Sequence, residues 1–143
     1  MPDVNTQPVA PGTPAARESS IVLVVDDDAE AGEAIAAELR RAGIRVRTAL
    51  NAEYALDCCR TRSFDAVVLD YHPADGYSEE LLEEAPDMGL AVVVSDAKWD
   101  VLADMKKRHA ASVFGIKVKP VSTAELVDVV QEAVAASRSQ AAR

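Results

Sequence analysis

Three short aliphatic runs constrain the fold of this chain more than any other feature. They are Ile21–Val25, Ala66–Leu69 and Leu90–Val94, and all three are rich in valine, isoleucine and leucine. A continuous run of this kind is typical of a parallel strand that is covered on both faces of its sheet. None of the runs is long enough to cross a bilayer. The sequence therefore predicts an α/β domain built on a buried parallel sheet.

Two weaker strands complete the expected sheet. Residues 44–48 alternate apolar and polar side chains, which is typical of an edge strand with one wetter face. Val113–Val118 is a fifth candidate, interrupted by Gly115 and Lys117. The segments between the strands have helical character, over about residues 28–42, 51–62, 78–84, 98–109 and 122–136.

Local signals mark where several of these helices begin. Asp28 and Asn51 are expected to cap the first two, and Ser122 with Glu125 forms a capping box for the last. A strand is followed by a helix five times over. Right-handed crossovers then give a doubly wound, five-stranded parallel sheet with helices on both faces.

Length and charge limit what such a domain can do. The chain has 143 residues, the usual size of one domain, and a formal net charge of −9. An acidic chain is poorly suited to bind nucleic acid or anionic membranes, because both need a basic surface. The adjacent Cys58 and Cys59 and the absence of a secretory pattern favour a reduced, cytoplasmic setting.

The composition also divides the chain. Residues 1–19 hold four of the seven prolines and few large apolar groups, so they are expected to form a disordered tail. Residues 20–136 form the predicted domain. Residues 137–143 have the composition of a second tail.

Polar side chains stand at the carboxyl ends of four of the predicted strands. Asp26 and Asp27 follow the first strand, Asp70 ends the third, Ser95 ends the fourth, and Lys119 follows the fifth. In open α/β sheets, ligands bind outside this edge. We therefore expect these acids, the hydroxyl and the ammonium group to meet at one site.

This combination suits phosphoryl transfer. Neighbouring carboxylates repel one another and attract a hard cation such as Mg²⁺, which prefers oxygen ligands. A metal that neutralises Asp70 and a phosphate oxygen would let Asp70 attack phosphorus as a nucleophile. Ser95 can donate a hydrogen bond to the phosphoryl oxygens, and Lys119 can pair with them as a point charge.

Four motifs together resemble the receiver domains of two-component response regulators. They are VVDDD at 24–28, VVLD at 67–70, VVVS at 92–95 and the Lys119-Pro120 pair. The resemblance implies strand order 2-1-3-4-5, with Asp70 as phosphoacceptor, Ser95 as switch hydroxyl and Lys119 as the pairing lysine. It implies a Mg²⁺ site made by Asp26, Asp27, Asp70 and the main-chain carbonyl of His72.

The resemblance also implies partners. A histidine kinase or a histidine phosphotransfer protein would donate the phosphoryl group. Because too little chain follows the last helix for an output domain, output would come from binding a downstream protein. On this interpretation the chain is a stand-alone receiver and not an enzyme.

The sequence departs from the family pattern at three places. The segment between Asp70 and Gly76 is about two residues short, Ile116 stands where an aromatic switch residue is usual, and Asp96 replaces a very small residue after the hydroxyl. These departures leave open a pseudo-receiver, an interaction module that works without phosphorylation. A Mg²⁺-dependent phosphatase is a further alternative, but it would need a second acid where His72 stands.

Two other features have simple structural interpretations. His72 is expected to be a loop residue with an exposed ring, which contributes only its main-chain carbonyl to the site. The basic run Lys106-Lys107-Arg108-His109 is expected to complement the dipole at a helix C-terminus, with partner docking as the alternative.

Overall fold

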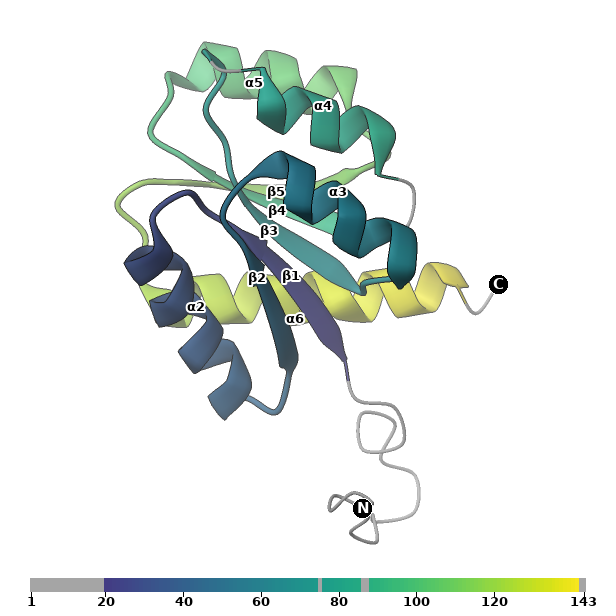
Figure 1. Ribbon diagram of the computed structural model, residues 1–143. Coiled ribbons are helices and arrows are strands. Elements are labelled where there is room, and N and C mark those ends of the chain that lie inside the picture. The colour runs from purple at the N-terminus through teal and green to yellow at the C-terminus, as the bar shows by residue number, and fades with distance from the viewer. Residues whose placement is uncertain (1–19, 75, 86–87, 142–143) are drawn as a thin grey trace, which may run out of the picture.

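The computed structural model describes residues 20–74, 76–85 and 88–141 (Figure 1). Five parallel strands form one sheet in the order β2-β1-β3-β4-β5, as predicted. The strands are β1 (Ile21–Val25), β2 (Arg45–Ala49), β3 (Ala66–Asp70), β4 (Leu90–Ser95) and β5 (Val113–Val118).

The three central strands are buried along their whole length. In the register of the sheet, Val22 of β1 lies between Val46 of β2 and Ala66 of β3. Both faces of these strands are covered, so apolar side chains suit every position and the sequence shows a continuous run. The edge strand β2 instead alternates, with Arg45 and Arg47 exposed.

Helices cover both faces of the sheet (Figure 1). The helices are α2 (Ala29–Arg41), α3 (Ala52–Thr61), α4 (Tyr77–Glu84), α5 (Trp99–Arg108) and α6 (Thr123–Ala141). One apolar cluster joins the sheet to α3, α4 and α5, and a second joins it to α2 and α6. The predicted doubly wound architecture is therefore confirmed.

The predicted helix starts are also confirmed. The carboxylate of Asp28 accepts hydrogen bonds from the N–H groups of Glu30 and Ala31 at 3.0 and 3.2 Å. Asn51 accepts from the Tyr54 N–H at 2.8 Å. Ser122 and Glu125 bond reciprocally, each side chain accepting from the other's N–H. These caps satisfy donors that the first turn of a helix leaves unpaired.

Helix α6 continues into the segment that we assigned to a C-terminal tail. Residues 137–141 are helical, so the sequence-based end of the helix is too early. A long-range ion pair stabilises this extension, because the Arg138 guanidinium lies 3.2 Å from the carboxylate of Asp65. That carboxylate also accepts from the N–H of Ile21 at 2.8 Å, and so joins α6 to the start of β1.

Two further expectations concern the chain as a whole. The predicted N-terminal tail, residues 1–19, lies outside the described residues, as do residues 142–143. Within the part that the structure describes, no helix is long and apolar enough to span a membrane.

Candidate functional site

The carboxyl ends of four strands place the predicted site residues at one edge of the sheet. Asp26 directly follows β1, Asp70 is the last residue of β3, Ser95 is the last residue of β4, and Lys119 directly follows β5. Lys119 is joined to Pro120 by a cis peptide bond, and its N–H donates to the Ser95 carbonyl at 2.9 Å. The parallel topology therefore brings together residues that are far apart in the sequence.

Asp70 lies at the centre of the site. Its side chain is only 6 % exposed, and its two carboxylate oxygens have different partners. Lys119 Nζ lies 2.8 Å from Oδ1, and His72 Nε2 lies 2.8 Å from Oδ2. Burial alone would raise the pKa of Asp70, but the hydrogen bonds from Lys119 and His72 outweigh it and hold the pKa below its ordinary value. Asp70 is therefore an ionised carboxylate at neutral pH.

The other two acids differ from Asp70 and from each other. Asp26 is buried, and this burial, together with the nearby charge of Asp70, raises its pKa to about 6. The N–H of Asp28 donates to Asp26 Oδ1 at 2.9 Å, which opposes the rise. Asp27 has a side chain that is 74 % exposed. One acid is thus held inside the site and one stands at its mouth.

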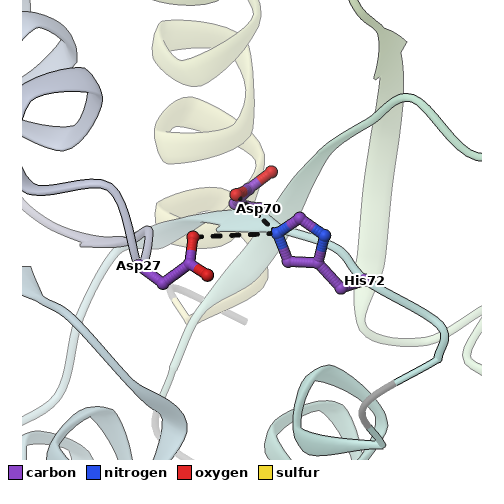
Figure 2. Close-up of side chains that lie close together, drawn as sticks. All are labelled: Asp27, Asp70 and His72. Atoms are coloured by element: carbon purple, nitrogen blue, oxygen red, sulfur yellow. Dashed lines mark hydrogen bonds and ion pairs between the residues drawn. The ribbon is translucent and has the colours of Figure 1, made fainter.

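Contrary to the expectation from the sequence, the ring of His72 does not point into solvent. Figure 2 shows it turned back toward Asp70 and Asp27, with Nε2 2.8 Å from Asp70 and 3.8 Å from Asp27. The backbone N–H of His72 donates to the Ser78 hydroxyl at 3.3 Å, and that hydroxyl donates to the Asp70 main-chain carbonyl at 3.5 Å. Ser78, on α4, therefore holds the loop after β3 in a turn that aims the imidazole at the carboxylates.

Ser95 reaches the site with its hydroxyl engaged by the backbone. The side chain is fully buried, its Oγ donates to the Tyr71 carbonyl at 2.8 Å, and it accepts from the Ala97 N–H at 3.1 Å. To donate to a phosphoryl group, the hydroxyl must release the Tyr71 carbonyl. In this structure the hydroxyl of Ser95 therefore donates to the backbone.

The donor set of the site fits a divalent cation. One ligand atom each from Asp27, Asp70 and His72 lies within 4.8 Å of the others. They line a hollow of about 220 Å³ that also contacts Asp26 and Ser78. Carboxylates that converge without an equal number of cations are the usual surroundings of such an ion.

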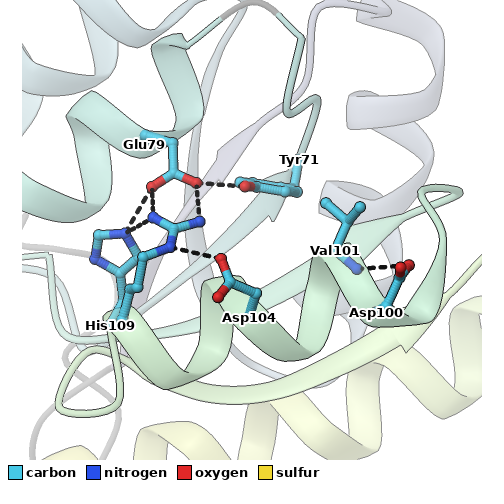
Figure 3. A network of polar contacts seen from close by, with 7 residues as sticks. Tyr71, Glu79, Asp100, Val101, Asp104 and His109 are labelled. Carbon is cyan, nitrogen blue, oxygen red and sulfur yellow. Dashed lines mark hydrogen bonds and ion pairs between the residues drawn. The ribbon is translucent and has the colours of Figure 1, made fainter.

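A polar network that the sequence does not predict lies beside the site (Figure 3). Tyr71, the residue after Asp70, is fully buried, and its hydroxyl donates to the carboxylate of Glu79 on α4. Arg108 donates to both oxygens of that carboxylate, at 2.7 and 3.0 Å, and His109 Nε2 lies 2.7 Å from it. The network joins the strand that carries Asp70 to α4 and to the end of α5.

The charges of this network shift the pKa values of its members. Arg108, with Tyr71 and His109, lowers the pKa of Glu79 to about 2, and burial together with Glu79 raises the pKa of Tyr71 to about 12. Two residues of the basic run at the end of α5, Arg108 and His109, thus have a specific partner in Glu79. The one signal in the sequence was that an arginine ends α5 and a histidine follows it, but nothing local pairs Arg108 with Glu79, 29 residues earlier.

The two departures near Ser95 also have defined places. Ile116 is partly buried and packs against the apolar cluster under α3, α4 and α5. Asp96 is exposed at the end of β4, near enough to contribute to the raised pKa of Lys119, for which the hydrogen bond with Asp70 is the main cause. Asp96 therefore adds negative charge near Lys119.

Comparison with solved structures identifies the fold. A CheY-like receiver domain from Methanospirillum hungatei JF-1 matches with a TM-score of 0.75 and 21% identity, over 86% of this chain and 99% of that one. The chemotaxis protein CheY4 of Vibrio cholerae matches at 0.69 and 21%, over 80% and 98%. A Burkholderia pseudomallei response regulator, solved with a phosphorylated aspartic acid and a calcium ion, matches at 0.69 and 20%, over 87% and 74%.

Sequence comparisons give no closer relationship. No family model matches the chain, and no curated protein matches it significantly. The structural neighbours share too few residues to transfer a function, but their agreement over most of the chain is unambiguous. The chain therefore has the fold of a response regulator receiver domain.

Proposed function

We propose that this chain is a phosphoacceptor receiver domain that takes a phosphoryl group onto Asp70 and signals by binding another protein. The observation that carries the proposal is the state of Asp70. It is a buried carboxylate, kept ionised by Lys119 and His72, at the edge of the sheet where four strands end. An ionised oxygen is the nucleophile that attack on phosphorus needs.

The transfer needs few protein groups. A carboxylate oxygen of Asp70 forms the new O–P bond while the P–N bond of a phosphohistidine breaks, and the electron pair of that bond stays with the donor's imidazole. Lys119 would then pair with the phosphoryl oxygens, and Ser95 would exchange the Tyr71 carbonyl for one of them. The protein acts mainly by positioning and charge.

Mg²⁺ is the metal that we propose for this step. Asp26, Asp27 and Asp70 would hold it, with the main-chain carbonyl of His72 as a further ligand. When bound, Mg²⁺ neutralises the negative charge that the carboxylates and the phosphoryl group would otherwise share. The proposed sources of the phosphoryl group are a histidine kinase or a histidine phosphotransfer protein, in the cytoplasm. We propose no catalytic turnover on another substrate.

Intact-mass measurement tests the proposal directly. The protein is incubated with acetyl phosphate and Mg²⁺, and a gain of one phosphoryl group is expected. Asp70→Asn should abolish the gain, because the amide is not a nucleophile. Asp57→Asn, an exposed acid on α3, is the matched control and should label like the parent. Equal labelling of the Asp70→Asn variant would overturn the assignment of the acceptor.

A pseudo-receiver is the second candidate, and the place of His72 favours it. The imidazole already occupies Oδ2 of Asp70, while Lys119 occupies Oδ1. A module that never receives phosphate could keep its acid neutralised in this way. The same experiment separates the two, since a pseudo-receiver gains no mass from either acetyl phosphate or a phosphorylated protein donor.

A further inference from the structure

We propose that the site binds a divalent transition-metal ion of the Zn²⁺ type, through the imidazole of His72 together with the carboxylates of Asp27 and Asp70. The inference deepens the proposed function, on which its location rests, and concerns which metal the site prefers. It depends on the side chain of His72, where a Mg²⁺ site would use only the main-chain carbonyl. It can be tested with no phosphoryl donor present.

The positions of the three side chains support a shared ion. His72 Nε2 lies 2.8 Å from Asp70 Oδ2 and 3.8 Å from Asp27 Oδ1, and all three ligand atoms fall within 4.8 Å (Figure 2). Zinc lies about 2.0–2.2 Å from nitrogen and oxygen ligands in tetrahedral geometry, so two of its ligands are about 3.4 Å apart. An ion can therefore replace the proton between His72 and Asp70 with small movements of these side chains.

The chemistry of the donors selects the ion. Mg²⁺ takes oxygen ligands and keeps several waters, so the imidazole adds little to its binding. Imidazole nitrogen is a preferred ligand of Zn²⁺ and of related first-row ions, and carboxylates complete many of their sites. One histidine and two acids therefore favour a transition-metal ion over Mg²⁺ at the same carboxylates.

The orientation of His72 is built into the loop. Its backbone N–H donates to the Ser78 hydroxyl, and its ring is part-buried, with 41 % of the side chain exposed. The ring lines the hollow of about 220 Å³ that also contains Asp26 and Asp27. Lys119 pairs with the other oxygen of Asp70, Oδ1, so an ion at Oδ2 does not require that ion pair to break.

A second histidine provides the matched control. Glu79, Glu83 and His109 also bring three ligand atoms within 4.8 Å. There, however, the Arg108 guanidinium already bonds both oxygens of Glu79, at 2.7 and 3.0 Å. Both oxygens of Glu79 are thus engaged by a fixed cation, whereas Lys119 engages only Oδ1 of Asp70, so this cluster is expected to stay without metal.

Calorimetric titration of the whole chain with Zn²⁺ and, separately, with Mg²⁺ tests the proposal. We expect one Zn²⁺ per chain, bound more tightly than Mg²⁺. His72→Gln should weaken Zn²⁺ binding by about tenfold or more, because a metal ligand is lost. The same variant should change Mg²⁺ binding by less than about threefold, because Mg²⁺ does not use the imidazole. His109→Gln should leave Zn²⁺ binding within the same limit.

Absorption of Co²⁺ bound in place of Zn²⁺ gives an independent readout. The parent should show visible bands of a nitrogen- and oxygen-ligated ion, and His72→Gln should change them. The proposal is wrong if His72→Gln binds Zn²⁺ as tightly as the parent, or if only His109→Gln weakens it. It is equally wrong if Co²⁺ gives a thiolate band, which would place the ion at the buried Cys58 or Cys59.

The two proposals fail separately. Loss of acetyl phosphate labelling in Mg²⁺ bears on the phosphoacceptor function and leaves the Zn²⁺ titration unaffected. If Zn²⁺ is not bound selectively, the His72 ring has no role as a metal ligand. Labelling of Asp70 in Mg²⁺ is then still tested by its own experiment.

Discussion

At the scale of single residues, Ser95 has a structural role besides the one proposed for it in signalling. Its hydroxyl pairs the Tyr71 carbonyl and the Ala97 N–H, and the side chain is fully buried. Removing the hydroxyl leaves two backbone groups without that partner. A buried group that loses its hydrogen bond costs more than the bond itself contributed.

Ser95→Ala should therefore lower the free energy of unfolding by about 1–3 kcal/mol. Urea denaturation of the parent and the variant measures the difference. Ser63→Ala, at an exposed position before β3, is the control and should stay within about 0.5 kcal/mol. If the two variants were equally stable, the hydroxyl of Ser95 would contribute nothing to the folded state.

The raised pKa of Asp26 makes folding stability depend on pH with the opposite sign to that of an ion-paired acid. Burial raises its pKa to about 6 from an unfolded value of 3.8. The folded chain therefore binds the proton more tightly than the unfolded chain does. The stability contributed by the protonated acid is present below about pH 4 and is lost as the pH rises through about 6.

Asp26→Asn should consequently stabilise the metal-free protein at pH 8, by about 1–3 kcal/mol, and have little effect near pH 4. Unfolding free energies measured in chelator across this range provide the test. Asp28→Asn is the control, because asparagine caps a helix as well as aspartate does. A stabilisation that is the same at pH 4 and pH 8 would contradict the role of the buried charge.

At the scale of elements, one junction joins four parts of the fold. Asp65 precedes β3, and its carboxylate holds the start of β1 and Arg138 of α6. Its backbone lies against Gly89, the residue before β4. Gly89 has φ +77°, and a Cβ there would lie 2.4 Å from the Asp65 carbonyl. Only glycine permits the two segments to approach this closely.

Gly89→Ala should destabilise the protein by about 3 kcal/mol or more, because the methyl group meets backbone that cannot move aside. Gly43→Ala is the matched control, since Gly43 also has a positive φ but nothing lies within 4 Å of its Cβ position. It should cost only about 1–2 kcal/mol, the cost of the left-handed backbone. Thermal unfolding of both variants tests the difference, and equal losses would show that the contact with Asp65 is unimportant.

Some of these elements could be predicted from the sequence and others could not. Strands and helix starts were predictable, because aliphatic runs and caps such as Asp28 and Asn51 act over a few residues. The strand order came from the resemblance to receiver domains, not from local patterns. The end of α6 was not, since its pairing with Asp65 spans 73 residues. The ring of His72 was misplaced for a similar reason, because Ser78 on the next helix fixes the loop.

In the candidate site, the sequence predicts which residues meet but not which polar atoms bond to each other. That Asp26, Asp70, Ser95 and Lys119 would meet follows from the topology of a parallel sheet, because each stands where a strand ends. The partner of each polar atom does not follow from topology. The bond between Ser95 and the Tyr71 carbonyl, and the network around Glu79, depend on how loops and helices pack, which no local pattern encodes.

At the scale of the whole molecule, the described sheet has two edge strands, and one of them carries exposed arginines. That strand, β2, pairs only with β1 there, and Arg45 and Arg47 are exposed along it. Unpaired backbone groups on such a strand offer a template to another copy of the chain. Two arginines in alternate positions place like charges opposite each other when two such edges approach.

Self-association is therefore the hazard that these two arginines restrain. Arg45→Thr with Arg47→Thr should increase light scattering and the binding of amyloid dyes on long incubation at high concentration. The double variant carries a net charge two units more negative than the parent value of −9, which on its own would favour solubility. Lys106→Thr with Lys107→Thr on α5 makes the same change in net charge and should remain clear. Should both variants remain clear, the open edge would be protected by something other than its charge; if only the β2 variant clouds, local repulsion at one strand keeps this acidic protein in solution.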